Sequence, residues 1–230
     1  MAFDDGAVVT AHVPNTGSMS GCWSPGAPVQ LSHSDNPRRK LAWTLERVDM
    51  GAGWVGVHTG RTNAVMAEGI TGGRIPALGG GYGELRREVE FAPTGHPKGR
   101  LDIALAKGPG ALPDAWIEVK NVTLLDDDCL RFPDAVTTRG RKHLGLLRAA
   151  VERGDRGVML FAVNRPEGES FAPAWSIDPA YAECLAAVAK AGVEILAVRI
   201  RHTETGLEVA EGLPVDLTRG IGPKKMATTP

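Results

Sequence analysis

The sequence predicts a mixed α/β domain preceded by a β-rich N-terminal module. Residues 1–80 form short apolar or alternating segments separated by Gly, Pro, Asn and Ser clusters, a pattern typical of short strands and tight turns. The rest of the chain contains segments with helical periodicity and a continuous apolar run at 157–163, typical of a strand buried on both faces, and residues 193–200 predict another buried strand. Because helices and buried strands alternate there, we expect a mixed sheet covered by helices.

The N-terminal module is expected to occupy residues 1–61 as a small antiparallel barrel or sandwich. Three tryptophans in it, Trp23, Trp43 and Trp54, are candidates for stacking on bases, although such residues more often belong to a core. Its four expected strands cover residues 7–13, 29–32, 41–48 and 54–58.

The α/β domain is expected to occupy residues 62–220, followed by a flexible polar tail at 221–230. Thr62 is a candidate cap for a short helix reaching Gly69. Asp178, followed by Pro179 in the first turn, predicts a helix that continues to Gly192. The other expected elements are strands at 85–91, 101–106 and 116–122 and a helix from 133 to 154.

Composition narrows the function classes. With 26 Lys and Arg against 27 Asp and Glu the net charge is −1, which argues against a wholly basic nucleic-acid binder and requires any polyanion site to be local. Three scattered cysteines favour reduced thiols in the cytoplasm over a disulfide framework. A transmembrane run and a signal peptide are both absent from the sequence, so we expect a cytoplasmic protein without membrane contact. The sequence also lacks a phosphate loop, a dinucleotide fingerprint and zinc spacing, so no small-molecule cofactor is expected.

The residues that could carry chemistry lie on two neighbouring expected strands. Asp102 is in one, and Glu118 and Lys120 share a face of the next. A hairpin over residues 107–114 would place Asp102 beside Glu118, and two carboxylates form a hard oxygen site suited to magnesium. A nearby lysine can orient water or offset phosphate charge, as in metal-dependent phosphodiester cleavage. The alternative is a cross-strand ion pair on a solvated sheet face.

A local excess of positive charge follows this strand pair. Residues 131–156 contain seven Arg and Lys against three Asp and Glu, a net charge of +4. Within it, Arg139, Lys142 and His143 lie within one helical turn and could contact a phosphate backbone. A solvated helix face is the alternative. Asp126, Asp127 and Asp128 could bind cations, but a polar loop is the more common outcome.

Several longer stretches resemble one known family. They include Ala11-His-Val-Pro-Asn-Thr-Gly-Ser-Met19, Gly99-Arg-Leu-Asp102, Glu118-Val-Lys-Asn-Val-Thr-Leu124 and Arg139-Gly-Arg-Lys-His-Leu144. In this order they resemble the sugar fermentation stimulation protein family over nearly the full length. The resemblance implies an N-terminal OB-fold and a C-terminal domain similar to the PD-(D/E)xK nucleases. It also implies sequence-nonspecific DNA binding and a role in regulating sugar (maltose) metabolism.

The resemblance also implies roles for individual residues. Asp102 and Glu118 look like metal-binding and catalytic carboxylates for magnesium or manganese, and Lys120 looks like the catalytic lysine. Glu68 falls where such nucleases place a further acidic residue, with Glu88 as a competing candidate. The family begins upstream of Met1, so we expect either a missing first barrel strand or an earlier start. The expected DNA-binding residues are Arg100, Arg139, Arg141, Lys142, His143 and Arg148.

Overall fold

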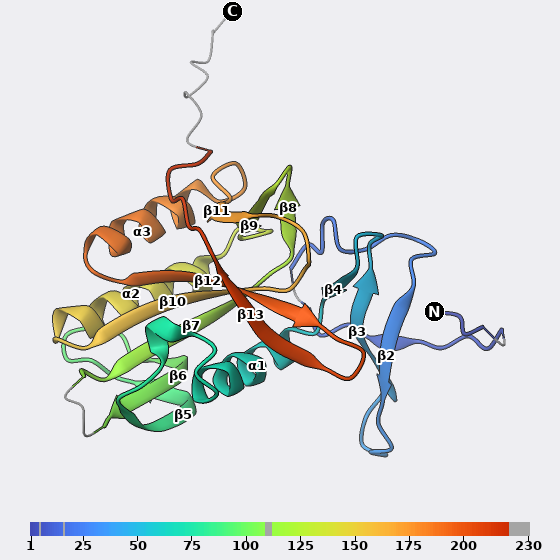
Figure 1. The fold of residues 1–230 in the computed structure, drawn as a ribbon, viewed down its shortest axis with the longest axis horizontal. Helices are drawn as coiled ribbons and strands as arrows, with labels where there is room; N and C mark the ends of the chain where they lie inside the picture. Colours follow the sequence, from blue (N-terminus) through green and yellow to red (C-terminus); the bar gives the residue numbers. More distant parts are fainter. Residues whose placement is uncertain (5, 16, 109–111, 221–230) are drawn as a thin grey trace, which may run out of the picture.

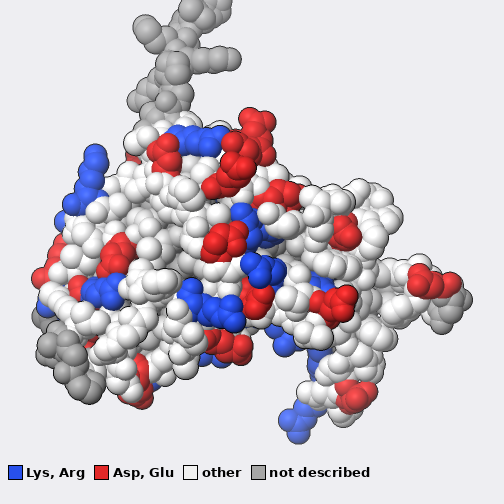
Figure 2. Space-filling model, viewed as in Figure 1, with Lys and Arg blue, Asp and Glu red and all other residues white. Residues whose placement is uncertain are grey.

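The computed structural model describes residues 1–220 except 5, 16 and 109–111, and it contains a small N-terminal β module packed against a larger α/β domain (Figure 1). The tail expected at 221–230 therefore lies outside the described residues. Figure 2 shows acidic and basic side chains interspersed over the visible face of the described chain, in keeping with the near-neutral net charge. Within the described residues, none of the helices is both long and apolar enough to cross a membrane.

The N-terminal module is a four-stranded sheet built around β3 (Trp43–Asp49). β1 (Ala11–His12) pairs parallel with β3, whereas β2 (Val29–His33) and β4 (Trp54–Gly56) pair antiparallel with it. The strand expected at 7–13 is therefore wrong over most of its length. Val8 instead forms an isolated bridge with Ala2 and is 77% exposed, because the N-terminal residues fold back on themselves. The module core contains Cys22, Leu45, Val48, Val55 and Val57.

The tryptophans of this module occupy three different environments. Trp43 packs edge-on against Phe3 and His33, and Trp54 lies under the Arg47 guanidinium, so both are engaged within the protein. Trp23 is half exposed. The three rings therefore do not form one platform for stacking bases.

The α/β domain is built on a six-stranded sheet in the order β13-β12-β10-β7-β6-β5. β5 (Tyr82–Phe91), β6 (Gly99–Lys107) and β7 (Ala115–Val122) form an antiparallel meander. β10 (Arg156–Val163) and β12 (Glu194–His202) continue parallel to β7, and β13 (Leu207–Leu213) closes the edge antiparallel to β12. The expected mixed sheet is confirmed.

Helices cover both faces of this sheet. α1 (Thr59–Thr71) packs on one face, where Met66 and Ile70 join Ile117 and Val119 in one core cluster. α2 (Thr138–Glu152) and α3 (Pro179–Lys190) pack on the other face in a second cluster. Because β10 is covered on both sides, seven of its eight residues are buried, which explains its continuous apolar sequence.

A small second sheet was not predicted. It contains β8 (Leu124–Asp126), β9 (Cys129–Phe132) and β11 (Ser170–Pro173), whose short lengths give little alternation to detect. Of the three consecutive aspartates, Asp126 ends β8 and Asp127 and Asp128 form the β8–β9 turn. Asp126 pairs with Arg131 and Asp128 with Arg219, so they follow the polar-loop alternative rather than a cation site. A 3₁₀ turn at Pro76–Leu78 was also missed.

Helix boundaries depart from expectation where side chains have tertiary partners. α1 begins at Thr59, and Thr62 is buried within it, donating to Asn121 Oδ1 at 2.9 Å instead of capping the helix. α2 begins later than expected because the Thr137 hydroxyl caps it, accepting from the Gly140 amide at 3.0 Å. The α3 cap is confirmed, since Asp178 accepts from the Tyr181 amide at 2.9 Å.

The two parts of the chain are joined by polar contacts. The Gly56 amide donates to Asn164 O at 2.7 Å, and Arg47 donates to Thr203 O at 3.0 Å. On the other side, the Met19 amide donates to Asp134 at 3.2 Å. The Met19 contact brings the loop before β2 of the N-terminal module to the α/β domain.

Candidate functional site

The β6–β7 hairpin brings the two expected carboxylates together. The β6–β7 ladder ends where Ile103 pairs with Ile117, and the next residues on the two strands are Asp102 and Glu118. Asp102 Oδ2 accepts a hydrogen bond from the Val119 amide at 2.7 Å, so its carboxylate is fixed against the neighbouring strand. The backbone of β7 therefore determines where this carboxylate lies.

Asp102 is also held from α1. Asn63 Nδ2 donates to Asp102 Oδ1 at 2.8 Å. Burial, and then the negative charge of Glu118, raise the pKa of Asp102 to about 6, although the Val119 amide, Lys120 and Asn63 act in the opposite direction. The two carboxylates therefore repel each other, and a bound cation would offset that repulsion.

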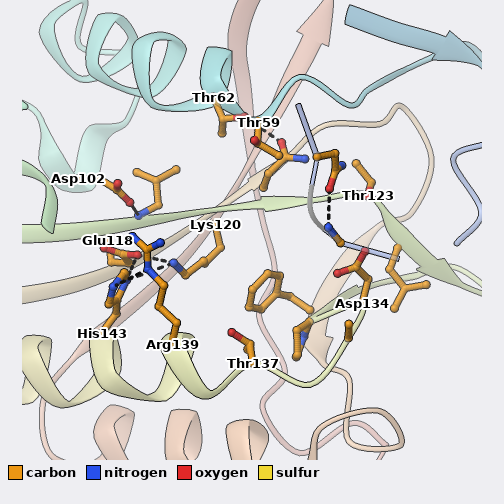
Figure 3. A pocket seen from close by; sticks show the side chains of 18 of the residues that line it. Thr59, Thr62, Asp102, Glu118, Lys120, Thr123, Asp134, Thr137, Arg139 and His143 are labelled. Atoms are coloured by element: carbon orange, nitrogen blue, oxygen red, sulfur yellow. Dashed lines mark hydrogen bonds and ion pairs between the residues drawn. The ribbon is translucent and has the colours of Figure 1, made fainter. Parts of the chain in front are cut away.

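Glu118 is nearly fully buried and only half of its carboxylate is satisfied. Oε1 accepts from Lys120 Nζ and from His143 Nδ1, whereas Oε2 has no hydrogen-bond partner among the described residues. Burial raises the pKa of Glu118, but hydrogen bonds and positive charge from His143 and Lys120 outweigh it and hold the pKa below its ordinary value. Figure 3 shows these side chains pointing toward one another.

His143 has a different position from the one expected. It was predicted to bind DNA, but it is 9% exposed and its Nδ1 contacts Glu118. Arg139 Nε donates to His143 Nε2 at 3.5 Å, which leaves Nδ1 to carry the proton donated to Glu118. His143 therefore orients the buried carboxylate, because α2 packs directly against β7.

A cavity of about 590 Å³ lies beside these groups, and residues of both the N-terminal module and the α/β domain line it (Figure 3). Asn15 and Gly17 of the N-terminal module line it, as do Thr59 of α1 and Asp134 of the loop before α2. Asp134 accepts hydrogen bonds from Ser18 Oγ and the Met19 amide, so it joins the two modules at the cavity wall.

The donor set fits a divalent cation. Carboxylate oxygens are the ligands that magnesium and manganese prefer, and a buried carboxylate oxygen without a partner at a cavity is a position that a cation would satisfy. In the described part of the chain, His, Cys, Asp and Glu nowhere form a group of three or more arranged to hold a metal. Asp102 and Glu118 would therefore share the ion with water and substrate oxygens, as is common for magnesium.

The two further acidic candidates lie in different places. Glu68 is five residues after Asn63 on α1, roughly 140° around the helix, and it lines a separate cavity with His58 and His202. Its expected place among the metal ligands is therefore wrong. Glu88 falls opposite Asp102, because the flanking β5 residues pair with Ile103 and Leu101, and its backbone has a φ of +53°. Its carboxylate lies 3.5 Å from Asn63 Nδ2 but is half exposed.

The basic segment contains two cations without a carboxylate partner. Arg141 pairs with the buried Asp178, which holds it against the protein, whereas Arg148 forms an exposed pair with Glu152. Arg100 lies 4.0 Å from Glu88. Arg131, Arg153 and Arg156 also pair with carboxylates. Within residues 131–156, all of them described, Arg139 and Lys142 remain without an ion pair, and both lie beside the site.

Sequence reasoning missed the amide groups that position the site. Asn63 holds Asp102, and Asn121 accepts from Thr62 and from Asn164 Nδ2 at 2.8 Å. Asn164 in turn binds the N-terminal module through Gly56. Asn63 directly follows Thr62, the residue expected to cap a helix, so its place on a helix could have been predicted. Its contact with Asp102 could not, because that contact depends on how α1 docks on the sheet.

Together these features define a class of two-domain proteins, in which a small β domain precedes a mixed α/β domain whose central sheet carries a buried carboxylate pair. The family model described as "SfsA N-terminal OB domain" matches residues 2–57, and that described as "Sugar fermentation stimulation protein RE domain" matches residues 60–206. The chain belongs to the sugar fermentation stimulation protein family, as the resemblance predicted.

Relatives and a solved structure agree with this assignment. A sugar fermentation stimulation protein homolog of Geobacter sulfurreducens is 48% identical over 212 residues, covering 92% of this chain and 88% of the relative. One of Magnetococcus marinus is 49% identical over 213 residues, covering 93% and 88%. The structure of Pyrococcus furiosus SfsA in complex with Ca²⁺ has a TM-score of 0.79 and 23% identity, covering 91% of this chain and 87% of that one. That likeness supports the fold.

Proposed function

We propose that this protein binds DNA without sequence preference and hydrolyses its phosphodiester bonds with magnesium or manganese. The observation that carries the proposal is the buried pair of Asp102 and Glu118: one Glu118 oxygen has no partner among the described residues, and both residues line a cavity that residues of both modules enclose. A buried carboxylate oxygen without a partner is costly, so Glu118 Oε2 favours a cation as the missing partner. The Pyrococcus protein, whose solved structure is a complex with Ca²⁺, adds support for a hard-cation site.

The surrounding residues have separate parts in this proposal. Asp102 and Glu118 would hold the ion, while Asn63 and His143 keep the two carboxylates oriented. When bound, the ion would polarise the phosphate and favour ionisation of water. Lys120, next to Glu118, would hydrogen-bond the attacking water or a phosphate oxygen. Arg139 and Lys142 would contact flanking phosphates, since their charges are free of carboxylates.

A second candidate function is a DNA-binding regulator of sugar (maltose) metabolism that does not cut DNA. The observation favouring it is the ion pair between Lys120 and Glu118, in which the lysine itself balances one carboxylate. In that case the constellation stabilises the sheet face, and the phosphate contacts of Arg139 and Lys142 would be retained. The two candidates therefore differ in catalysis and agree on DNA binding.

The experiment that separates them is a plasmid cleavage assay with magnesium or manganese. Wild-type protein is compared with Lys120→Ala and Asp102→Asn, and with the matched surface variants Lys190→Ala and Asp216→Asn. The nuclease proposal predicts metal-dependent cleavage by the wild type and the surface variants only. Equal cleavage in every sample would indicate contamination, and no cleavage in any sample would favour the regulator.

A further inference from the structure

A second cavity, of about 570 Å³, adjoins the carboxylate site along α2. One side is the connection between β5 and β6, and the other is the exposed side of α2. Arg139 and His143 line both this cavity and the first one, so the two are neighbours. We call this second cavity the α2 groove. Its lining residues are His96, Pro97, Lys98, Gly99, Arg139, Lys142, His143, Gly145 and Leu146.

The α2 groove is suited to an anionic chain. Acidic residues are absent from its described lining. Lys98 and Lys142, one on each side, form neither an ion pair nor a hydrogen bond with any described residue, so both ammonium groups are available to a ligand. Pro97 adds apolar surface to the lining, and Leu146, which is 6% exposed, adds the small part of its side chain that is not buried. A ligand whose phosphates contact the two lysines and whose apolar group contacts Pro97 would match this arrangement.

Gly145, an exposed glycine within α2, is a second indication that the α2 groove has space for a ligand. Glycine destabilises a helix interior relative to alanine, so a glycine in the middle of α2 calls for a reason. Other helix glycines have a packing reason: a Cβ at Gly69 would lie 2.3 Å from Val209, and one at Gly140 would lie 2.8 Å from Thr137. A Cβ at Gly145 would meet no atom within 4 Å. Internal packing therefore does not require this glycine, and its missing side chain keeps the α2 groove open.

We propose that the α2 groove holds one unpaired DNA strand next to the scissile phosphate, and that Gly145 leaves space for its base. An unpaired base can lay its face on Pro97, Gly145 and Leu146 while its phosphates contact Lys98 and Lys142. A duplex hides its base faces in the stack and would use only the lysines. This inference rests on the proposed DNA binding and adds the class of substrate, a single-stranded segment.

The test fills the α2 groove without removing a charge. Gly145→Leu is compared with Gly145→Ala and wild type by fluorescence anisotropy, using a single-stranded oligonucleotide and the corresponding duplex in EDTA. We expect Gly145→Leu to weaken single-strand binding about tenfold, the loss of roughly one stacked base, and duplex binding less than twofold. Urea midpoints should rise for Gly145→Ala and not fall for Gly145→Leu, because both residues favour helix more than glycine does.

Charge variants complete the design. Lys98→Ala and Lys142→Ala should weaken both DNA forms, whereas Lys190→Ala, a lysine on α3 outside the α2 groove, should change neither. Unchanged single-strand affinity in a folded Gly145→Leu protein, or an equal loss for both DNA forms, would overturn the inference. EDTA prevents cleavage, so this assay measures binding alone. A wild-type protein that binds DNA but never cuts it would therefore refute the proposed nuclease activity without contradicting the proposed role of the α2 groove.

Discussion

Asp178 connects the two helices on one face of the sheet, so replacing it should destabilise the fold more than an ordinary cap. Its carboxylate is 2% exposed and accepts from the Tyr181 amide at 2.9 Å, the Thr137 amide at 2.8 Å and Arg141 at 3.4 Å. Loss of the α3 cap costs about 1 kcal/mol. The Thr137 amide left without a partner costs about 1 kcal/mol more, and the partly exposed Arg141 pair adds less than about 1 kcal/mol.

Asp178→Ala should therefore lower the free energy of unfolding by about 2–3 kcal/mol, with a fall in Tm of roughly 8 °C for a chain of this size. Urea unfolding, with an unchanged m-value, measures it. Asp216→Ala is the matched control, because Asp216 accepts from the Thr218 amide in the same way but in an exposed turn, and it should change little. If Asp178→Ala loses no more stability than Asp216→Ala, the joint role of this carboxylate is refuted.

Three further predictions concern pH, metal and salt. Burial, and then the charge of Arg47, lower the pKa of His202 to about 4, so its contribution is complete above pH 6.5 and is lost as pH falls toward 4. Between pH 7.5 and pH 5, the free energy of unfolding measured in urea should fall by about 2 kcal/mol more for the wild type than for His202→Gln. Equal falls in the two proteins would contradict this. Asn63→Ala should weaken Mn²⁺ binding in a calorimetric titration by about 10- to 100-fold, because it frees Asp102, and unchanged affinity would exclude that role. DNA affinity should fall as salt rises, and Lys142→Ala should reduce the slope of log K against log salt by about 1; a salt-independent affinity would exclude phosphate contacts.

The carboxylate pair could be predicted because it depends on local rules. Strand alternation puts Glu118 and Lys120 on one face, and a short hairpin fixes the register that brings Asp102 opposite Glu118. The cap at Asp178 was likewise predictable, since side chain and helix are adjacent in sequence.

The partners of that pair could not be predicted because they come from docked helices. The prediction that Glu68 is a metal ligand is wrong because α1 directs Asn63, and not Glu68, toward Asp102. No local sequence signal indicates which face of a helix contacts a given strand. Its position among basic residues predicts that His143 contacts a DNA phosphate, but the packing of α2 on β7 directs its side chain to Glu118 instead. The net charge of the basic segment was similarly misleading, since Arg141 has its partner Asp178 on α3, far along the chain.

The central claim is that Asp102 and Glu118 form a divalent metal site, and a Mn²⁺ titration followed by electron paramagnetic resonance tests it most directly. We predict one tightly bound Mn²⁺ per chain in the wild type and in Lys120→Ala, and loss of that binding in Asp102→Asn and Glu118→Gln. Circular dichroism of each variant checks that it is folded. Equal Mn²⁺ binding by the wild type and a folded Asp102→Asn protein, or no binding by the wild type, would contradict the claim.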